Sequence, residues 1–274
     1  MSPSLPDLYD RLVLKHPGTV LLLVILCTAL FSFHIPDFKL DASADSLVLE
    51  NDTTLRYYRS IRARYGSDDY LIVTYTPQGD LFSDAVLADL RSLRDKLAAL
   101  DRVDSVVSLL DVPLINSPPM TLTELSRETR TLDSPGTDIV LAQAEFVSSP
   151  LYRNLLISPD RQTTTLQVNF RRDETYYRLL NERNRLREQR LKTALSADEA
   201  AALAAVSQQF DDYSTAQLAQ QRRDIDSVRH IMDEHRDQAR LYLGGVPMIV
   251  ADSIEFIRHD LVSFGAGVLC FIVL

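Results

Sequence analysis

Two uncharged apolar runs, one near each end of the chain, constrain the fold more than any other feature. Residues 17–33 are rich in Leu, Val and Ile, and residues 261–274 form a second such run. A bilayer core of about 30 Å needs about 20 helical residues to cross it. We therefore expect a transmembrane helix over residues 17–35 and the truncated start of a second one over residues 259–274. On this interpretation the chain is the front piece of a longer membrane protein.

A cleaved secretory signal is the alternative for the first run, but its apolar region is usually shorter. No small-x-small cleavage pattern follows the run, and the residue before Cys27 is Leu26, which argues against a lipoprotein signal. We expect the helix to be retained. Arg11 and Lys15 precede it, and positive charge favours a cytoplasmic segment over residues 1–16.

Residues 36–258 are then expected to form a domain outside the cytoplasm. The whole chain has 29 Lys and Arg against 38 Asp and Glu, a formal charge of −9. This balance argues against nucleic acid as a partner. Both cysteines, Cys27 and Cys270, fall in the apolar ends. The domain therefore has no disulfide and depends on its hydrophobic core.

Hydrophobic periodicity predicts an α+β fold for this domain. Four strands are expected at residues 70–76, 103–109, 163–170 and 240–243. A helix that begins after Ser83 carries a buried stripe at three- and four-residue steps: Val86, Leu87, Leu90, Leu93, Leu97 and Leu100. A second core helix is expected to carry Ile225, Val228, Met232 and His235. The order of these elements is strand, helix, strand, strand, helix, strand, which is the ferredoxin-like βαββαβ order with an antiparallel sheet.

A charged helical insertion, residues 174–219, separates the third strand from the second core helix. Ser196 and Glu199 form a capping box that opens its Ala-rich part. Its length and polarity predict a helical hairpin that projects from the sheet. Elsewhere we expect a short helix over residues 55–65, and candidate helix starts at Thr121 and Asp138 in an otherwise irregular segment.

Four short motifs resemble those of one transporter family. They are Gly66-Ser-Asp-Asp69 before the first strand, Val103-Asp-Ser-Val-Val-Ser-Leu109, Leu156-Ile-Ser-Pro-Asp160, and Gly244-Gly-Val-Pro247 before the second apolar run. In this order and spacing they resemble the first third to half of an RND-superfamily transporter, closest to the MMPL-like branch. That branch handles lipids and other hydrophobic cargo.

The resemblance implies the N-terminal part of a proton-motive-force-driven export permease of the bacterial inner membrane. Its partners would be the lipid bilayer, the remaining membrane helices, a second porter domain and hydrophobic or lipid-like cargo, and an oligomer is allowed. It implies no enzymatic activity and no cofactor, and it places the proton relay in a later helix. The alternative is a membrane-tethered periplasmic scaffold or binding protein, with residues 174–210 as its interaction arm.

Two groups of ionisable residues are candidate sites. His230 and His235 lie five residues apart, whereas zinc proteases place two histidines four apart in His-Glu-x-x-His. We interpret both, with the neighbouring acids, as a solvated helix face. Asp68-Asp69 and Asp211-Asp212 lack the alternating oxygen ligands of a calcium loop. We expect them to be turn and helix-start residues.

Two further candidates lie near the second apolar run. Gly244-Gly245 has no following Lys-Ser/Thr, so a strand-to-helix turn is favoured over a phosphate loop. Four residues, Glu255, Arg258, His259 and Asp260, are expected to anchor the apolar helix at the interface rather than to line an ion path. The sequence has no Gly-x-Ser-x-Gly, and the domain has no Cys nucleophile. It therefore indicates no catalytic, cofactor or metal residue, and it leaves the substrate-binding residues unknown.

Overall fold

A computed structural model of the chain describes residues 15, 17–32, 70–117, 119 and 129–273. The predicted helix over residues 55–65, the pair Asp68-Asp69 and the helix start at Thr121 lie outside these ranges. Residues 1–42 and 43–274 are separate units. The first contains α2 (Pro17–Ser32). Within the described ranges, no helix is both long enough and apolar enough to cross a membrane.

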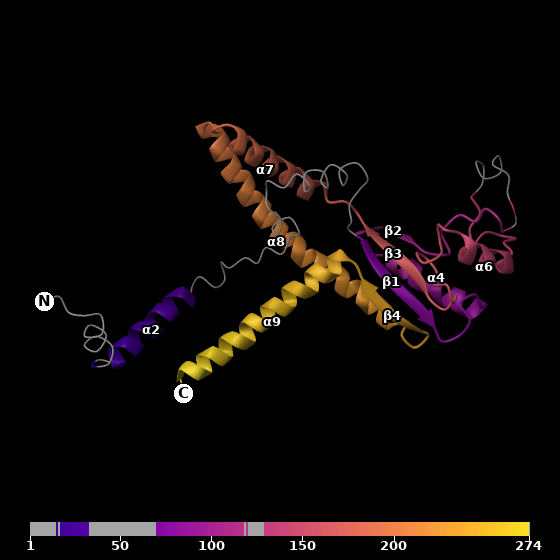
Figure 1. Ribbon diagram of the computed structural model, residues 1–274, viewed down its shortest axis with the longest axis horizontal. Coiled ribbons are helices and arrows are strands. Elements are labelled where there is room, and N and C mark those ends of the chain that lie inside the picture. The colour runs from indigo at the N-terminus through magenta and orange to yellow at the C-terminus, as the bar shows by residue number, and fades with distance from the viewer. Residues whose placement is uncertain (1–14, 16, 33–69, 118, 120–128, 274) are drawn as a thin grey trace. The chain divides into compact units, whose positions relative to one another are not determined.

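The second unit is α+β and contains a four-stranded antiparallel sheet (Figure 1). Its strands are β1 (Tyr70–Pro77), β2 (Val103–Val107), β3 (Thr164–Phe170) and β4 (Ala239–Gly244). They are ordered β2-β3-β1-β4. In the centre of the sheet, Val73 lies opposite Leu166 on one side and Leu243 on the other. All four predicted strands are confirmed, with small shifts at their ends.

The core lies on one face of this sheet. Leu71, Val73 and Tyr75 alternate with less buried residues along β1, as expected for a strand with one covered face. Helix α4 (Asp84–Ala98) covers this face with the leucines of the predicted stripe, of which Leu87, Leu90, Leu93 and Leu97 are buried. The C-terminal half of α8 (Ala197–Asp233) adds Ile225, Val228 and Met232.

Helices α4 and α6 begin at the predicted capping residues, but only one of these residues caps its helix with a side-chain hydrogen bond. Ser83 is the N-cap of α4, yet its hydroxyl donates to the Asp80 carbonyl rather than capping the helix. Asp138 does cap α6 (Ile139–Ser148), because its carboxylate accepts from the amides of Val140 and Leu141. The helix start predicted at Asp138 is therefore confirmed.

The charged insertion forms a hairpin of α7 (Glu174–Lys192) and the first half of α8 (Figure 1). The capping box of Ser196 and Glu199 is present. The hairpin has its own hydrophobic cluster, made of Leu179, Leu180, Leu186, Leu203, Val206 and Phe210. The cluster is separate from the core on the sheet, so the hairpin packs largely on itself.

The prediction of a separate helix after residue 219 was wrong. Helix α8 runs without interruption for 37 residues, or about 55 Å, from the capping box to Asp233. Residues 211–223 contain neither Gly nor Pro, so nothing in the backbone interrupts the helix there. One helix therefore belongs to the hairpin at its start and to the sheet core at its end.

Helix α9 (Val246–Val273) leaves the sheet through the glycine pair. Gly244 ends β4, and Gly245 has a φ of +123°. Pro247 lies in the first turn of α9, where its missing amide hydrogen costs no helix bond. The strand-to-helix turn is thus confirmed. Met248 and Ala251 then pack against the sheet core, which fixes the start of α9 on the domain.

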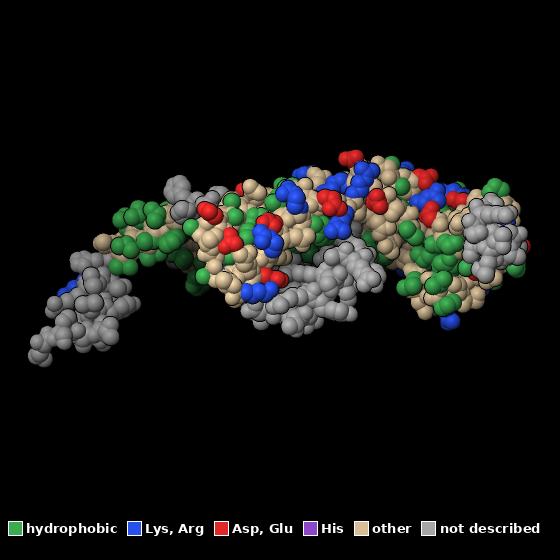
Figure 2. All heavy atoms as spheres, turned by 90° about the horizontal axis from the view of Figure 1, so that it is seen from above, with side chains coloured by type: hydrophobic (Ala, Val, Ile, Leu, Met, Phe, Trp, Pro, Cys, Tyr) green, Lys and Arg blue, Asp and Glu red, His purple; other side chains and the backbone are tan. Residues whose placement is uncertain are grey.

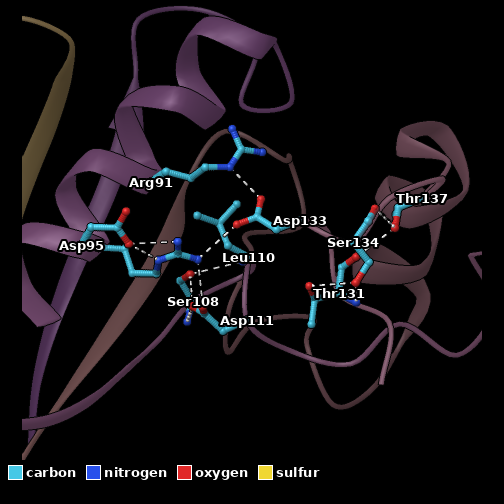
Figure 3. Close-up of polar contacts among 10 residues, drawn as sticks. Arg91, Asp95, Ser108, Leu110, Asp111, Thr131, Asp133, Ser134 and Thr137 are labelled. Carbon is cyan, nitrogen blue, oxygen red and sulfur yellow. Dashed lines mark hydrogen bonds and ion pairs between the residues drawn. The ribbon is translucent and has the colours of Figure 1, made fainter. Parts of the chain in front are cut away.

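An arginine network holds the segment after β2 onto α4 (Figure 3). Arg94 pairs with Asp111 at 2.9 Å and with Asp133 at 3.2 Å, and Arg91 pairs with Asp133 at 2.7 Å. The Ser108 hydroxyl donates to Asp111 at 2.6 Å. These side chains are partly exposed, so each pair contributes about 1 kcal/mol or less. Because the two arginines and the two aspartates pair with one another, we assign them a structural role.

Candidate functional site

A hollow of about 450 Å³ lies where α8 passes the start of β2 and the end of β3. This volume is within the usual range for a small-molecule site, about 300–1,000 Å³. The hollow is lined by residues from three separate segments: Leu100, Asp101, Arg102, Phe170, Gln220, Asp224 and Ser227. We treat it as a candidate binding site among the residues that the structure describes.

Arg102 and Asp224 are an ion pair among the residues that line the hollow. The Arg102 Nη1 donates to Asp224 Oδ2 at 3.1 Å, and Gln220 Nε2 donates to Asp224 Oδ1 at 2.9 Å. With its amide oriented to satisfy both neighbours, Gln217 accepts from Arg102 Nη2 at 2.7 Å and donates to Asp173 at 3.2 Å. The guanidinium is therefore compensated by a carboxylate and an amide oxygen.

Asp173 extends this network to the root of the hairpin. It caps α7 by accepting from the Tyr176 amide, and both its oxygens accept from the Tyr213 hydroxyl at 3.0 Å. Burial, followed by this bond to Asp173, raises the pKa of Tyr213. The hairpin is thus joined to the sheet domain beside the hollow through a chain of polar contacts.

The remaining lining residues make the hollow amphipathic. Leu100 and Phe170 are partly buried and pack against the sheet core. Asp101 is exposed at the rim, and the Ser227 hydroxyl donates to the Arg223 carbonyl of its own helix. None of the lining residues brings a nucleophile next to a base, so this arrangement is suited to binding rather than to covalent chemistry.

Helix α8 also contacts α9 through two ion pairs, which we call the α8–α9 clamp. Arg229 Nη2 donates to both oxygens of Asp252, at 2.9 and 2.7 Å, and Arg222 donates to Glu255. Arg222 lowers the pKa of Glu255 by this hydrogen bond. The side chains are 31–46% exposed, so solvent screens both pairs and each contributes little to stability. The clamp therefore sets the orientation of α9 more than its stability.

The clamp changes the interpretation of the residues predicted to anchor α9. Glu255 pairs with Arg222 of α8, so it is part of a helix–helix contact. Arg258, His259 and Asp260 are exposed on the next turn, with His259 Nδ1 3.9 Å from Asp260. The structure places these three residues neither at the clamp nor at the hollow.

The prediction that His235 lies on a solvated helix face was wrong. The residue is only 3% exposed, and Nδ1 lies 2.7 Å from Asp89 Oδ1. Asp89 Oδ2 also accepts from the Tyr75 hydroxyl at 2.8 Å. Helix α8 ends at Asp233, so His235 lies in the following turn and points toward α4. His230, which remains on the helix, is exposed as expected.

The acidic residues weighed with the two histidines also have defined places in the structure. Lys96 Nζ donates to Glu234 at 2.8 Å, which lowers the pKa of Glu234, and lies 3.5 Å from His235 Nε2. Asp211 and Asp212 lie inside α8, so their prediction as turn and helix-start residues was wrong. No group of three or more His, Cys, Asp or Glu side chains within the described ranges could hold a metal ion.

The Tyr75 hydroxyl makes the domain sensitive to alkali. Burial, followed by the bond to Asp89, raises the pKa of Tyr75. Below about pH 10, the ordinary tyrosine value, the hydroxyl is neutral in both states and its contribution is fully present. Above it the unfolded chain ionises first, so stability falls as pH rises toward the folded pKa. We expect the free energy of unfolding, measured with urea, to fall less steeply between about pH 10 and pH 12 in Tyr75→Phe than in the parent. Equal slopes would contradict this origin.

The lining residues of the hollow were not identified from the sequence. Arg102 and Asp224 are 122 positions apart, and neither belongs to a motif. The only local signal is that Gln220 and Asp224 are four apart on a helix, a spacing that places two side chains on one face. That signal is common on solvated helices, so it does not distinguish a site.

Comparisons with known proteins do not assign the chain to a family. No protein-family model matches the sequence, and no curated protein gives a significant match. The resemblance carried by the four motifs therefore stays a hypothesis about function.

Proposed function

We propose that this chain is the N-terminal part of a proton-motive-force-driven, RND/MMPL-like export permease for hydrophobic or lipid-like cargo. It would supply the first porter domain, of ferredoxin-like βαββαβ type and located in the periplasm, together with its tethers in the bacterial inner membrane. The four motifs support this proposal. So does the strand order β2-β3-β1-β4, with α4 and α8 on one face of the sheet.

One observation carries the proposal further than the motifs do. Helix α8 lines the hollow with Gln220, Asp224 and Ser227, and it is clamped to α9 by Arg222 and Arg229. A displacement of α9 would therefore be transmitted to the hollow through a single rigid helix. Rigid elements that connect two sites are one means by which movement at membrane helices can reach an external cargo site.

The apolar surfaces of α2 and α9 support the membrane tethers. Large side chains on both helices are more than half exposed, among them Leu22 at 67% on α2 and Phe264 at 74% on α9. Exposed apolar surfaces of this kind mark membrane or protein contacts. We propose that both helices lie in the membrane, with the lipid bilayer, further helices and a second porter domain as their partners.

The competing function is a membrane-tethered periplasmic scaffold or binding protein. The hairpin supports it, because α7 and α8 have their own core and present charged side chains of both signs on the face shown in Figure 2. A scaffold would need the hairpin surface but not the clamp. The two functions therefore differ in what happens when α8 and α9 are uncoupled.

The clamp provides the test, carried out in the complete gene product in inside-out membrane vesicles. We expect Arg229→Glu to lower protonophore-sensitive movement of a lipophilic dye by about fivefold or more, the usual size of a coupling between sites. The double variant Arg229→Glu, Asp252→Arg reverses the pair and should restore most of the movement. Arg240→Glu, at an exposed arginine of β4, is the control for charge reversal. If the parent shows no protonophore-sensitive movement, the scaffold function is favoured.

A further inference from the structure

The hollow at the root of the hairpin carries an uneven charge. Arg102 is paired with Asp224 and bonded to Gln217, so its charge is compensated. Asp101 lies at the rim, is exposed, and has no ion-pair partner among the described residues. The hollow therefore presents one uncompensated carboxylate beside the apolar side chains of Leu100 and Phe170.

From this arrangement we infer that the hollow binds amphiphiles with a cationic head group, whose ammonium lies at Asp101 and whose apolar part lies against Leu100 and Phe170. The inference rests on the proposed function, because it names the class of cargo head group that the hollow would accept. The inference follows from the pairing of the charges: Asp101 has no ion-pair partner among the described residues, whereas Arg102 is paired with Asp224. An anionic head would have to displace Asp224 from Arg102, and it would approach the unpaired Asp101.

The expected preference for a cationic over an anionic head group is modest because Asp101 is exposed to solvent. An ion pair with an exposed carboxylate is screened by solvent and contributes weakly to binding, and the repulsion of a like charge is of similar size. The difference between a cationic and an anionic ligand with the same chain then corresponds to about tenfold in binding. A nonionic ligand should fall between them.

Cysteine protection in the full chain tests this directly. In a Cys27→Ala, Cys270→Ala background in lipid nanodiscs, Ser227→Cys places a thiol on the lining of the hollow. The rate of its alkylation by N-ethylmaleimide is measured with octyltrimethylammonium, octyl glucoside or octyl sulfate below their micelle-forming concentrations. We expect octyltrimethylammonium to protect at about one tenth of the concentration that octyl sulfate requires.

A matched thiol controls for effects on the membrane or the reagent. Thr215→Cys lies on the same helix, is exposed and does not line the hollow, and Thr215 bonds the Asp211 carbonyl as Ser227 bonds that of Arg223. It should be alkylated at the same rate with and without each amphiphile. Equal slowing at both thiols would mean that the amphiphiles act through the bilayer and would overturn the inference.

Two variants identify the charges that set the preference. Asp101→Asn should abolish the advantage of the cationic ligand over the nonionic one, whereas Asp104→Asn, also exposed and outside the hollow, should preserve it. Asp224→Asn leaves Arg102 without its carboxylate and should improve protection by octyl sulfate. Equal protection by all three amphiphiles in the parent would refute the inference without bearing on dye movement, which tests transport separately.

Discussion

Replacing Leu90 by alanine is expected to lower the free energy of unfolding by about 2–5 kcal/mol, the usual range for a buried leucine that leaves a cavity. Leu90 lies mid-way along α4 and is fully buried against the sheet. The surrounding leucines of α4 and the valines of the sheet are held by backbone bonds of regular elements, so they can close the space only in part. Urea unfolding of the full chain in detergent, followed by far-UV circular dichroism, gives the measurement.

The control for this prediction is a leucine with the opposite exposure. Leu151 is 64% exposed in the turn after α6, so Leu151→Ala removes the same atoms with little change in burial. A change within about 0.5 kcal/mol is expected for it. If Leu90→Ala also falls within that range, α4 does not cover the sheet as described.

The elements that could be predicted are those whose signal is local. Leu87, Leu90, Leu93 and Leu97 recur at helical spacing because one face of α4 meets the sheet. Strands β1, β3 and β4 alternate between more and less buried residues because only one face of the sheet is covered, and their ends are marked by turn residues. In each case a few neighbouring residues carry the whole pattern, so no tertiary contact has to be known.

The errors occurred where the outcome depended on helix continuity. The hairpin and the second core helix have different surfaces, one largely charged and one half-buried, and this difference suggested two helices. The backbone between them has no interruption, so a single helix changes surroundings along its length. The same misjudgement affected His235, because the helix ends two residues before it and turns its ring into the core.

The hollow could not be predicted because its residues meet only in the folded chain. Arg102 follows α4, Phe170 ends β3 and Asp224 lies on α8, and each is ordinary in its own segment. Their proximity is a consequence of the strand order, which places β2 and β3 side by side under α8. The clamp is similar, since Arg229 and Asp252 lie on different helices.

Gly245→Ala is expected to be among the most destabilising single changes in the domain, at about 3 kcal/mol or more. A Cβ at this position would lie 2.7 Å from the Tyr70 carbonyl oxygen and 3.1 Å from the Leu71 Cα, both backbone atoms. The φ of +123° is also rarely adopted by L-residues, which adds about 1–3 kcal/mol of strain. Neither conflict is relieved by rotating a side chain, so β1 and β4 must separate. The measurements are urea unfolding, which should show the lower free energy of unfolding, and hydrogen exchange, which should be faster in β1 and β4.

The adjacent glycine isolates the cause. At Gly244 the nearest atom to an added Cβ is the Ile72 carbonyl oxygen at 3.9 Å, an ordinary contact. Gly244→Ala should therefore change stability by less than about 1 kcal/mol, since it also restricts the unfolded chain. The two glycines look equivalent in the sequence, but only Gly245 allows α9 to start directly against β1. If Gly245→Ala were as mild as Gly244→Ala, the start of α9 would have room to shift on the sheet. The clamp would then be the main constraint on α9, and a displacement of α9 could be absorbed at the turn instead of reaching the hollow.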